Sequence, residues 1–257
     1  MLLFGPMNEN NNGGNGVGLG IQHRKSPFAE YFKEVIYGGI DGIVTTFAVV
    51  SGFSGAALSS DTTTQLTFIV VLLFGLANLF ADAVSMGLGN FLSVRSEKDQ
   101  YAILRAKEQS LIQMNPASEK EETIALMRTK GFSETDAKTL ADIYSTNEDY
   151  WLDFMMANEY EMSDPRGDNP VLTGLTTFGA FIAFGAIPIL PFIFLQDMTS
   201  VQMFQVSTIG TILALMLLGM MKWKIVGTGF ARSIGEVVLV GATASIIAFM
   251  VGTFFRF

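Results

Sequence analysis

Residues 66–94 read LTFIVVLLFGLANLFADAVSMGLGNFLSV, an apolar run in which Asp82 is the only charged side chain. As a helix this run would rise roughly 44 Å, which exceeds the roughly 30 Å of hydrocarbon in a bilayer. Residues 35–58 form a similar run, and Asp41 is its only charged side chain. An acid inside a membrane helix costs about 2.5–3.5 kcal/mol on insertion scales. Two such acids indicate a route for ions rather than a simple membrane anchor.

Three further apolar runs, at 171–195, 201–221 and 233–255, are each long enough to cross a bilayer as a helix. The chain has 257 residues, of which 49% are hydrophobic and 16% charged, and its mean hydropathy is +0.39. Soluble domains carry about 25% charged residues. The sequence therefore predicts an all-α, multi-pass integral membrane protein with five transmembrane helices.

Basic residues mark one side of this predicted membrane domain. They lie before the first run, after the second and between the fourth and fifth: Arg24, Lys25, Lys33, Arg95, Lys222, Lys224 and Arg232. The connections at 58–65 and 196–200 contain no Lys or Arg. Since positive charge stays on the cytoplasmic side, we expect the N-terminus and residues 96–168 in the cytoplasm and the C-terminus outside.

These features divide the chain into four predicted parts. Residues 1–29 are rich in Asn and Gly, lack a signal-peptide pattern and are expected to be disordered. Residues 30–95 hold transmembrane helices one and two, and 169–257 hold helices three to five. Between them, 96–168 form a helical cytoplasmic insert, with helices expected at 96–114, at 117–130 and from Ser133 to Met162, the last with a break near 145–147.

The insert is strongly acidic. Residues 96–168 contain 16 Asp and Glu against 8 Lys and Arg, which accounts for the whole net charge of −8. This excess argues against nucleic acid as a partner and favours a cation, although a solvated acidic surface would look the same. The chain has no Cys, and its one His is His23, so metal ligands must be carboxylates, thioethers or neutral oxygens.

Candidate metal ligands in the insert share a helical spacing. Met155 and Glu159 lie four residues apart on one predicted helix face, with Met156 at its edge. Glu108, Glu119 and Glu122 lie on the two preceding helices. Mixed oxygen and thioether donors suit Fe²⁺ better than Mg²⁺ or Ca²⁺. The competing interpretation is that the methionines pack in a core and the glutamates face solvent.

The membrane acids have no basic residue within their own runs to neutralise them. Met86 lies four residues after Asp82 and so on the same helix face. Glycines at 38, 39, 42, 52 and 55 permit close helix packing, a dimer contact included. Pro188 and Pro191 should break or kink the third span.

Four motifs, taken together, resemble the vacuolar iron transporter family. They are Tyr37-Gly-Gly-Ile-Asp41-Gly-Ile-Val-Thr-Thr-Phe47, Gly75-Leu-Ala-Asn78-Leu-Phe-Ala-Asp82-Ala-Val-Ser-Met86-Gly, Trp151-Leu-Asp-Phe-Met155-Met156-Ala-Asn-Glu159 and Ile187-Pro-Ile-Leu-Pro191-Phe. The resemblance implies a homodimer that exchanges Fe²⁺ for protons and moves iron out of the cytosol. It implies that Asp41 and Met86 line the route, to which we add Asp82 and Asn78 as candidates. It also implies that the insert gathers metal through Glu108, Glu119, Glu122, Met155, Met156 and Glu159.

The chain departs from the family pattern at two positions. Leu111 stands where a second glutamate is common in the first insert helix, and Asn90 stands where a glutamate often follows the second-span Met. Both changes predict fewer bound ions or weaker binding in the insert.

We therefore expect a secondary transporter of Fe²⁺, with Mn²⁺, Co²⁺ and Zn²⁺ as further candidates. No nucleotide-binding motif is present, so an ion gradient would supply the driving force. No permanently bound cofactor and no enzymatic activity are expected. The alternatives are a membrane-anchored metal sensor or buffer, or a ferroxidase. The membrane would be a plasma membrane or a vacuole-like organelle membrane.

Overall fold

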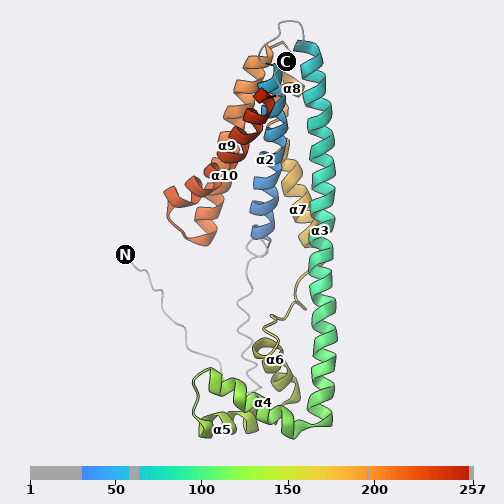
Figure 1. Cartoon of the computed structure of the whole chain (residues 1–257), viewed down its shortest axis with the longest axis vertical. Helices are drawn as coiled ribbons and strands as arrows, with labels where there is room; N and C mark the ends of the chain where they lie inside the picture. Colours follow the sequence, from blue (N-terminus) through green and yellow to red (C-terminus); the bar gives the residue numbers. More distant parts are fainter. Residues whose placement is uncertain (1–30, 58–63, 196, 255–257) are drawn as a thin grey trace, which may run out of the picture.

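The computed structural model describes residues 31–57, 64–195 and 197–254, and this part of the chain is helical with no strands. The predicted disordered segment 1–29 lies outside the described residues. The helices are α2 (Phe32–Ala57), α3 (Thr64–Met114), α4 (Pro116–Thr129), α5 (Glu134–Tyr144), α6 (Glu148–Asn158), α7 (Pro170–Gly185), α8 (Leu190–Phe194), α9 (Ser200–Val226) and α10 (Phe230–Phe254). Figure 1 shows a helical bundle above and a smaller group of helices, α4 to α6, below, joined by α3.

Helix α2 is the centre of the bundle, because it packs against α3, α7, α9 and α10. Its apolar residues contribute to two buried clusters. Ile43 packs with Leu215, Leu218 and Val237. Phe47 and Val50 pack with Val71, Phe192 and Met203. A helix buried on several sides needs apolar residues around most of its circumference, and the predicted first span supplies them.

Helix α3 is one uninterrupted helix of 51 residues, about 77 Å long. It contains both the second predicted span and the first predicted insert helix, which we had expected to be separate helices. Residues 91–114 contain no Gly or Pro, so nothing in the chain ends the helix where it leaves the apolar region. It ends at Met114, before Asn115 and Pro116.

Four helices, α2, α3, α9 and α10, are long and apolar enough to cross a membrane. The span predicted at 171–195 is interrupted, as expected from its two prolines. Helix α7 has 16 residues and ends at Gly185, and the five-residue α8 follows after a turn. Pro188 and Pro191 cause this break because proline supplies no backbone N–H. The Ser207 hydroxyl donates to the freed carbonyl of Pro188 at 2.7 Å.

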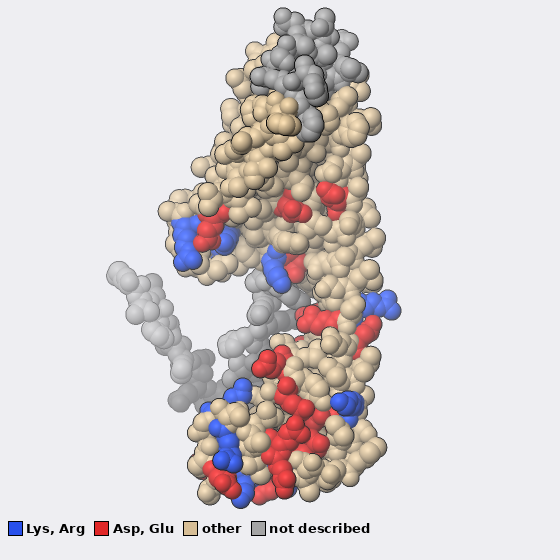
Figure 2. Space-filling view, viewed as in Figure 1, with Lys and Arg blue, Asp and Glu red and all other residues tan. Residues whose placement is uncertain are grey.

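The insert helices agree closely with the predicted ones. The expected break near 145–147 is present, since α5 ends at Tyr144 and α6 begins at Glu148. Helix α6 ends at Asn158, earlier than the predicted Met162. In Figure 2 acidic side chains are concentrated on this lower part of the molecule, and the bundle is mostly uncharged.

The basic residues of the α9–α10 turn lie at the end of the bundle that faces the insert (Figures 1 and 2). There Glu236 pairs with Lys222 at 2.6 Å and with Arg232 at 2.8 Å. All basic residues of the described bundle helices thus lie toward the insert, as the charge pattern predicted for a single side of the membrane.

Two glycine contacts bring α2 close to its neighbours. A Cβ at Gly42 would lie 2.5 Å from the carbonyl oxygen of Phe181 on α7, and a Cβ at Gly252 on α10 would lie 2.0 Å from the carbonyl oxygen of Gly52. Both distances are too short for a real Cβ. These glycines therefore allow close packing within one chain, as is common between membrane helices.

Replacing Gly42 by alanine should destabilise the bundle by about 1–3 kcal/mol, because the methyl group would push α2 away from α7. The matched control is Gly179→Ala on α7, where nothing lies within 4 Å of the added Cβ and helix propensity improves. Thermal unfolding of both variants in detergent measures the difference. Equal stability of the two variants would contradict the close α2–α7 contact.

Candidate metal and translocation sites

The two membrane acids lie on neighbouring helices, α2 and α3. Asp41 on α2 and Asp82 on α3 lie close enough for their charges to interact. Each side chain is partly buried. Asp41 lines a hollow of about 610 Å³ together with Lys33 and Lys222, yet no Lys or Arg among the described residues forms an ion pair with either acid. Carboxylates in an apolar bundle that form no ion pair can be stabilised by a cation or by protons.

The other candidate translocation residues take different positions around Asp82. The Asn78 side-chain amide donates to the Asp82 carboxylate at 2.8 Å, so Asn78 orients this acid. Met86 packs at the edge of an apolar cluster with Leu79 and Phe181. The structure therefore joins Asn78 and Asp82 by a hydrogen bond, places Asp41 on α2 within range of the Asp82 charge, and packs Met86 against α7.

In the insert, Glu108 and Glu119 form the centre of a buried acidic cluster. Glu108 on α3 is 0% exposed and Glu119 on α4 is 6% exposed, and their carboxyl groups lie close enough to interact. Burial, and then the charge of Glu159, raise the pKa of Glu108. Burial, and then the charges of Glu108 and Glu122, raise the pKa of Glu119 to about 7.

Glu159 and Glu122 lie around this centre. Burial, followed by the charges of Glu122 and Glu119, raises the pKa of Glu159. One oxygen each of Glu108, Glu119 and Glu159 is buried and accepts no N–H or hydroxyl hydrogen. Glu122 differs, because its residue is exposed on α4. A buried carboxylate oxygen without a donor is stabilised by a proton or by a cation, and three of the four predicted glutamates have such an oxygen.

Met155 and Met156 are fully buried in the core of the insert, where they pack with Tyr101, Trp151 and Leu152. The prediction that they belong to a core is therefore confirmed, and it does not exclude a ligand role. The Thr123 hydroxyl lies 3.3 Å from the Met155 sulfur, and Thr123 follows Glu119 by one helical turn. The Met155 sulfur thus lies beside the turn of α4 that carries Glu119.

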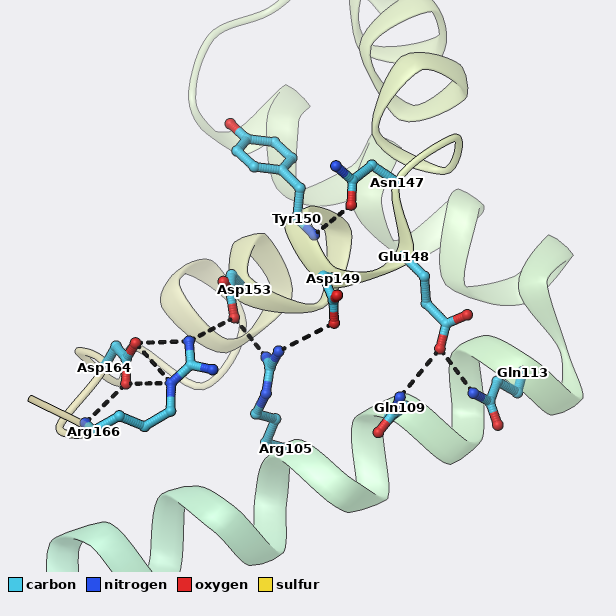
Figure 3. A network of polar contacts seen from close by, with 10 residues as sticks. All are labelled: Arg105, Gln109, Gln113, Asn147, Glu148, Asp149, Tyr150, Asp153, Asp164 and Arg166. Atoms are coloured by element: carbon cyan, nitrogen blue, oxygen red, sulfur yellow. Dashed lines mark hydrogen bonds and ion pairs between the residues drawn. The ribbon is translucent and has the colours of Figure 1, made fainter. Parts of the chain in front are cut away.

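A polar network, drawn in Figure 3, holds α6 against α3 and so brings these residues together. Arg105 of α3 pairs with Asp153 at 2.5 Å and with Asp149 at 3.6 Å. One turn further, Gln109 and Gln113 both donate to Glu148. Arg105 is largely buried, with 17% of its side chain exposed, whereas Asp153 and Asp149 are 46% and 86% exposed. Each ion pair therefore contributes modestly, and the contacts position α6 as a set.

The glutamates of the insert do not converge on one point. Among the described residues, no three Asp, Glu, His or Cys side chains are already close enough to form a metal centre. The cluster combines one interacting pair, Glu108 and Glu119, with the charges of Glu159 and Glu122 around it. Mutual repulsion of like charges accounts for this open arrangement.

A family model described as the VIT family matches residues 32–253, nearly all of the described chain. The chain belongs to the VIT family. The resemblance seen in the sequence motifs is confirmed.

Named relatives agree with this membership. A vacuolar iron transporter of Toxoplasma gondii is 34% identical over 235 residues, which cover 88% of this chain and 74% of that protein. Vacuolar iron transporter 1 of Arabidopsis thaliana is 31% identical over 220 residues, covering 86% and 84%. A vacuolar iron transporter of Centaurea cyanus is 31% identical over 230 residues, covering 89% and 90%. All are named as transporters, in agreement with the prediction that the chain is not an enzyme.

Two further candidate site residues of this VIT-family chain were not identified from the sequence. Tyr160 donates its hydroxyl hydrogen to Glu108 at 3.1 Å, and burial with the charge of Glu108 raises its pKa to about 12. Glu34 on α2 has a buried carboxylate oxygen without a donor. Glu34 precedes Asp41 by seven residues, a spacing that places both on one helix face and that could have identified it.

The two departures from the family pattern have different surroundings. Leu111 is 37% exposed on α3, so it fills no position in the insert core. The Asn90 amide donates to Thr177 on α7 at 2.7 Å, so this residue connects two helices. In this VIT-family chain, Asn90 donates a hydrogen bond that an ionised glutamate at position 90 could not donate.

Between about pH 4.5 and 8, the metal-free protein should lose stability as the pH rises, because the folded state must ionise Glu119 while the unfolded chain ionises it near 4.5. The contribution is present below pH 4.5 and is lost as the pH rises through about 7. Between pH 5 and pH 8, we expect the free energy of unfolding of Glu119→Gln to increase relative to that of the wild type by at most about 3 kcal/mol. Thermal unfolding in the presence of a chelator measures this difference. The control, Glu121→Gln, changes an exposed acid of α4 and should keep the wild-type pH profile. Parallel profiles for Glu119→Gln and wild type would argue against a buried, protonated acid.

Proposed function

We propose that this protein is a secondary transporter that moves Fe²⁺ out of the cytosol in exchange for protons, with Mn²⁺, Co²⁺ and Zn²⁺ as further substrates. The observation that carries this proposal is the pair Asp41 and Asp82, whose charges interact between two apolar helices without an ion pair to any described basic residue. The names of the relatives supply iron as the substrate. The membrane would be that of a vacuole-like organelle, in keeping with those names.

Proton coupling follows from the chemistry of the pair. Two adjacent carboxylates in an apolar bundle are stable when a divalent cation or protons compensate their charge. A carboxylate oxygen that binds Fe²⁺ cannot hold a proton at the same time. Loading of the metal therefore displaces protons, and protons arriving from the other side displace the metal, which gives an exchange with opposite directions of movement.

The insert would collect the metal on the cytoplasmic side. Its net negative charge raises the local concentration of cations, and the buried oxygens of Glu108, Glu119 and Glu159 lack other partners. Together with the Met155 sulfur they provide the mixed donors that Fe²⁺ accepts. Helix α3 carries Glu108 and Asp82 on one rigid element, so the insert stays at a fixed distance from the membrane pair.

A homodimer would complete the membrane site. Helices α2, α3 and α10 surround an apolar hollow of about 580 Å³, whose lining includes Gly52, Phe74 and Asn78. A second copy would cover this side of α2 and α3 and enclose the acids away from lipid. The placement of basic residues toward the insert supports a cytoplasmic insert.

Asp41→Asn should abolish Fe²⁺ flux into proteoliposomes under an imposed pH gradient, because the amide cannot exchange a proton for the metal. Flux is measured under anaerobic conditions with an internal iron-sensitive dye. The control, Asp99→Asn, changes an exposed acid on the same face of the membrane as the insert, outside the apolar part of α3, and should leave flux intact.

The flux assay also separates the competing functions. A wild-type protein that binds Fe²⁺ but carries none across the membrane under any gradient would be a sensor or buffer. Consumption of Fe²⁺ with O₂ and formation of Fe³⁺ would point to a ferroxidase. Flux that ignores the pH gradient would overturn proton exchange while retaining transport.

Glu108→Gln should raise the Fe²⁺ concentration needed for half-maximal flux at least about tenfold, because it removes a buried charged ligand of the insert. Maximal flux should change little, since the membrane pair is untouched. Concentration series in proteoliposomes distinguish the two parameters, and Glu121→Gln serves as the control. A lower maximal flux with an unchanged half-saturating concentration would contradict a capturing role of the insert.

A further inference from the structure

A chain of buried polar contacts crosses the core of the insert and ends at one methionine. The Trp151 indole N–H donates to the Thr123 hydroxyl oxygen at 2.7 Å. The Thr123 hydroxyl lies 3.3 Å from the Met155 sulfur and 2.8 Å from the Glu119 carbonyl oxygen. Thr123 and Met155 are 0% exposed, and Trp151 is 2% exposed. Water therefore does not compete for these contacts.

The donors and acceptors restrict how this chain can be arranged. An indole nitrogen only donates, so Trp151 occupies a lone pair of the Thr123 oxygen. The single hydroxyl hydrogen then lies between two acceptors, the Glu119 carbonyl and the Met155 sulfur. When the hydrogen points to the sulfur, the hydroxyl holds the Met155 thioether beside the turn of α4 that carries Glu119.

The two neighbouring methionines are therefore not equivalent. Both are fully buried, but among the described residues only the sulfur of Met155 has a hydrogen-bond donor within reach. Met has three rotatable side-chain bonds. A contact that fixes one of its rotamers before the metal arrives lowers the entropy lost on binding.

We propose that Thr123 is a positioning residue that directs the Met155 thioether toward the acidic cluster. Trp151 holds Thr123 in place, and Thr123 supports Met155, rather than Met156, as a sulfur ligand. This inference rests on the proposed metal binding by the insert. It assigns a role to Trp151 of the third sequence motif and to a threonine that the motifs did not include.

The test compares single and double variants of the full-length protein in detergent. Fe²⁺ binding is measured by anaerobic equilibrium dialysis. Thr123→Val keeps the shape and removes the hydroxyl, and Thr123→Ser keeps the hydroxyl. Thr123→Val should weaken Fe²⁺ binding about tenfold, the size typical of lost supporting contacts at metal sites, and Thr123→Ser should restore most of this loss.

Double variants separate positioning from packing. In a Met155→Leu background, Thr123→Val should cause no further loss of Fe²⁺ binding, because the sulfur that Thr123 positions is gone. In the matched Met156→Leu background, the two losses should multiply. A general weakening of the insert core would lower thermal stability and would reduce Fe²⁺ binding equally in both backgrounds.

Trp151→Phe provides a second variant that keeps the Thr123 hydroxyl and removes the N–H donor together with part of the ring, and Trp151→Leu serves as its control for lost ring volume. Trp151→Phe should weaken Fe²⁺ binding in the wild type and not in the Met155→Leu background. Multiplying losses for Thr123→Val and Met155→Leu, or wild-type binding by Thr123→Val, would overturn the positioning role while leaving metal binding by the insert intact. A wild-type protein that binds no Fe²⁺ would instead overturn the proposed function of the insert, and the positioning role with it.

Discussion

Negative charge buried without a positive partner is the constraint on which both candidate sites depend. In the bundle, Asp41 and Asp82 interact electrostatically across α2 and α3. In the insert, three glutamates each bury a carboxylate oxygen that has no N–H or hydroxyl donor. Each arrangement costs free energy unless a proton or a cation is present. Both the bundle and the insert are therefore stabilised by added positive charge, which a transported cation can supply.

Helix α3 gives the two sites a fixed relation to each other. Asp82 and Glu108 lie on the same uninterrupted helix, 26 residues apart and therefore separated by about 39 Å along its axis. A stiff connection of this kind keeps the insert from folding back onto the bundle. It also separates the acidic cluster of the insert from the membrane acids by a fixed length of helix. The acidic surface of the insert and of the adjoining part of α3 (Figure 2) keeps a cation near the protein over this distance.

The packing of the insert explains why its methionines fit both a role in the core and a role as metal ligands. Met155 and Met156 fill the core between α3, α4 and α6, which a Leu would also do. The difference is made by polar groups inside that core, namely Glu108, Thr123 and the Tyr160 hydroxyl. A core that buries acids beside thioethers gives up some apolar packing. Its ion-paired attachment through Arg105 and the glutamines of α3 offsets part of that loss.

The positions of α2, α9 and α10 follow from local composition, because runs of apolar residues long enough to span a bilayer have one stable form, the helix. The break between α5 and α6 was likewise visible in the sequence, where Ser145 to Asn147 interrupt the helical pattern. Composition alone could not show that α3 continues unbroken from the bundle into the insert. It also could not show that the third span divides into α7 and α8, since prolines kink some membrane helices and end others.

By itself the sequence determined the residue types that can bind a cation: without Cys, and with His23 as its one His, the chain had only oxygen and thioether ligands to offer. It also determined that Asp41 and Asp82 lie in apolar runs without a basic residue. Only the tertiary structure decided which of the candidate ligands are buried together. Glu119 and Glu122 are three residues apart on α4, and the packing of α3 and α6 buries the first and leaves the second exposed. Contacts between helices distant in the chain, such as Thr123 with Met155 and Glu108 with Tyr160, depend on that packing, and no local pattern encodes them.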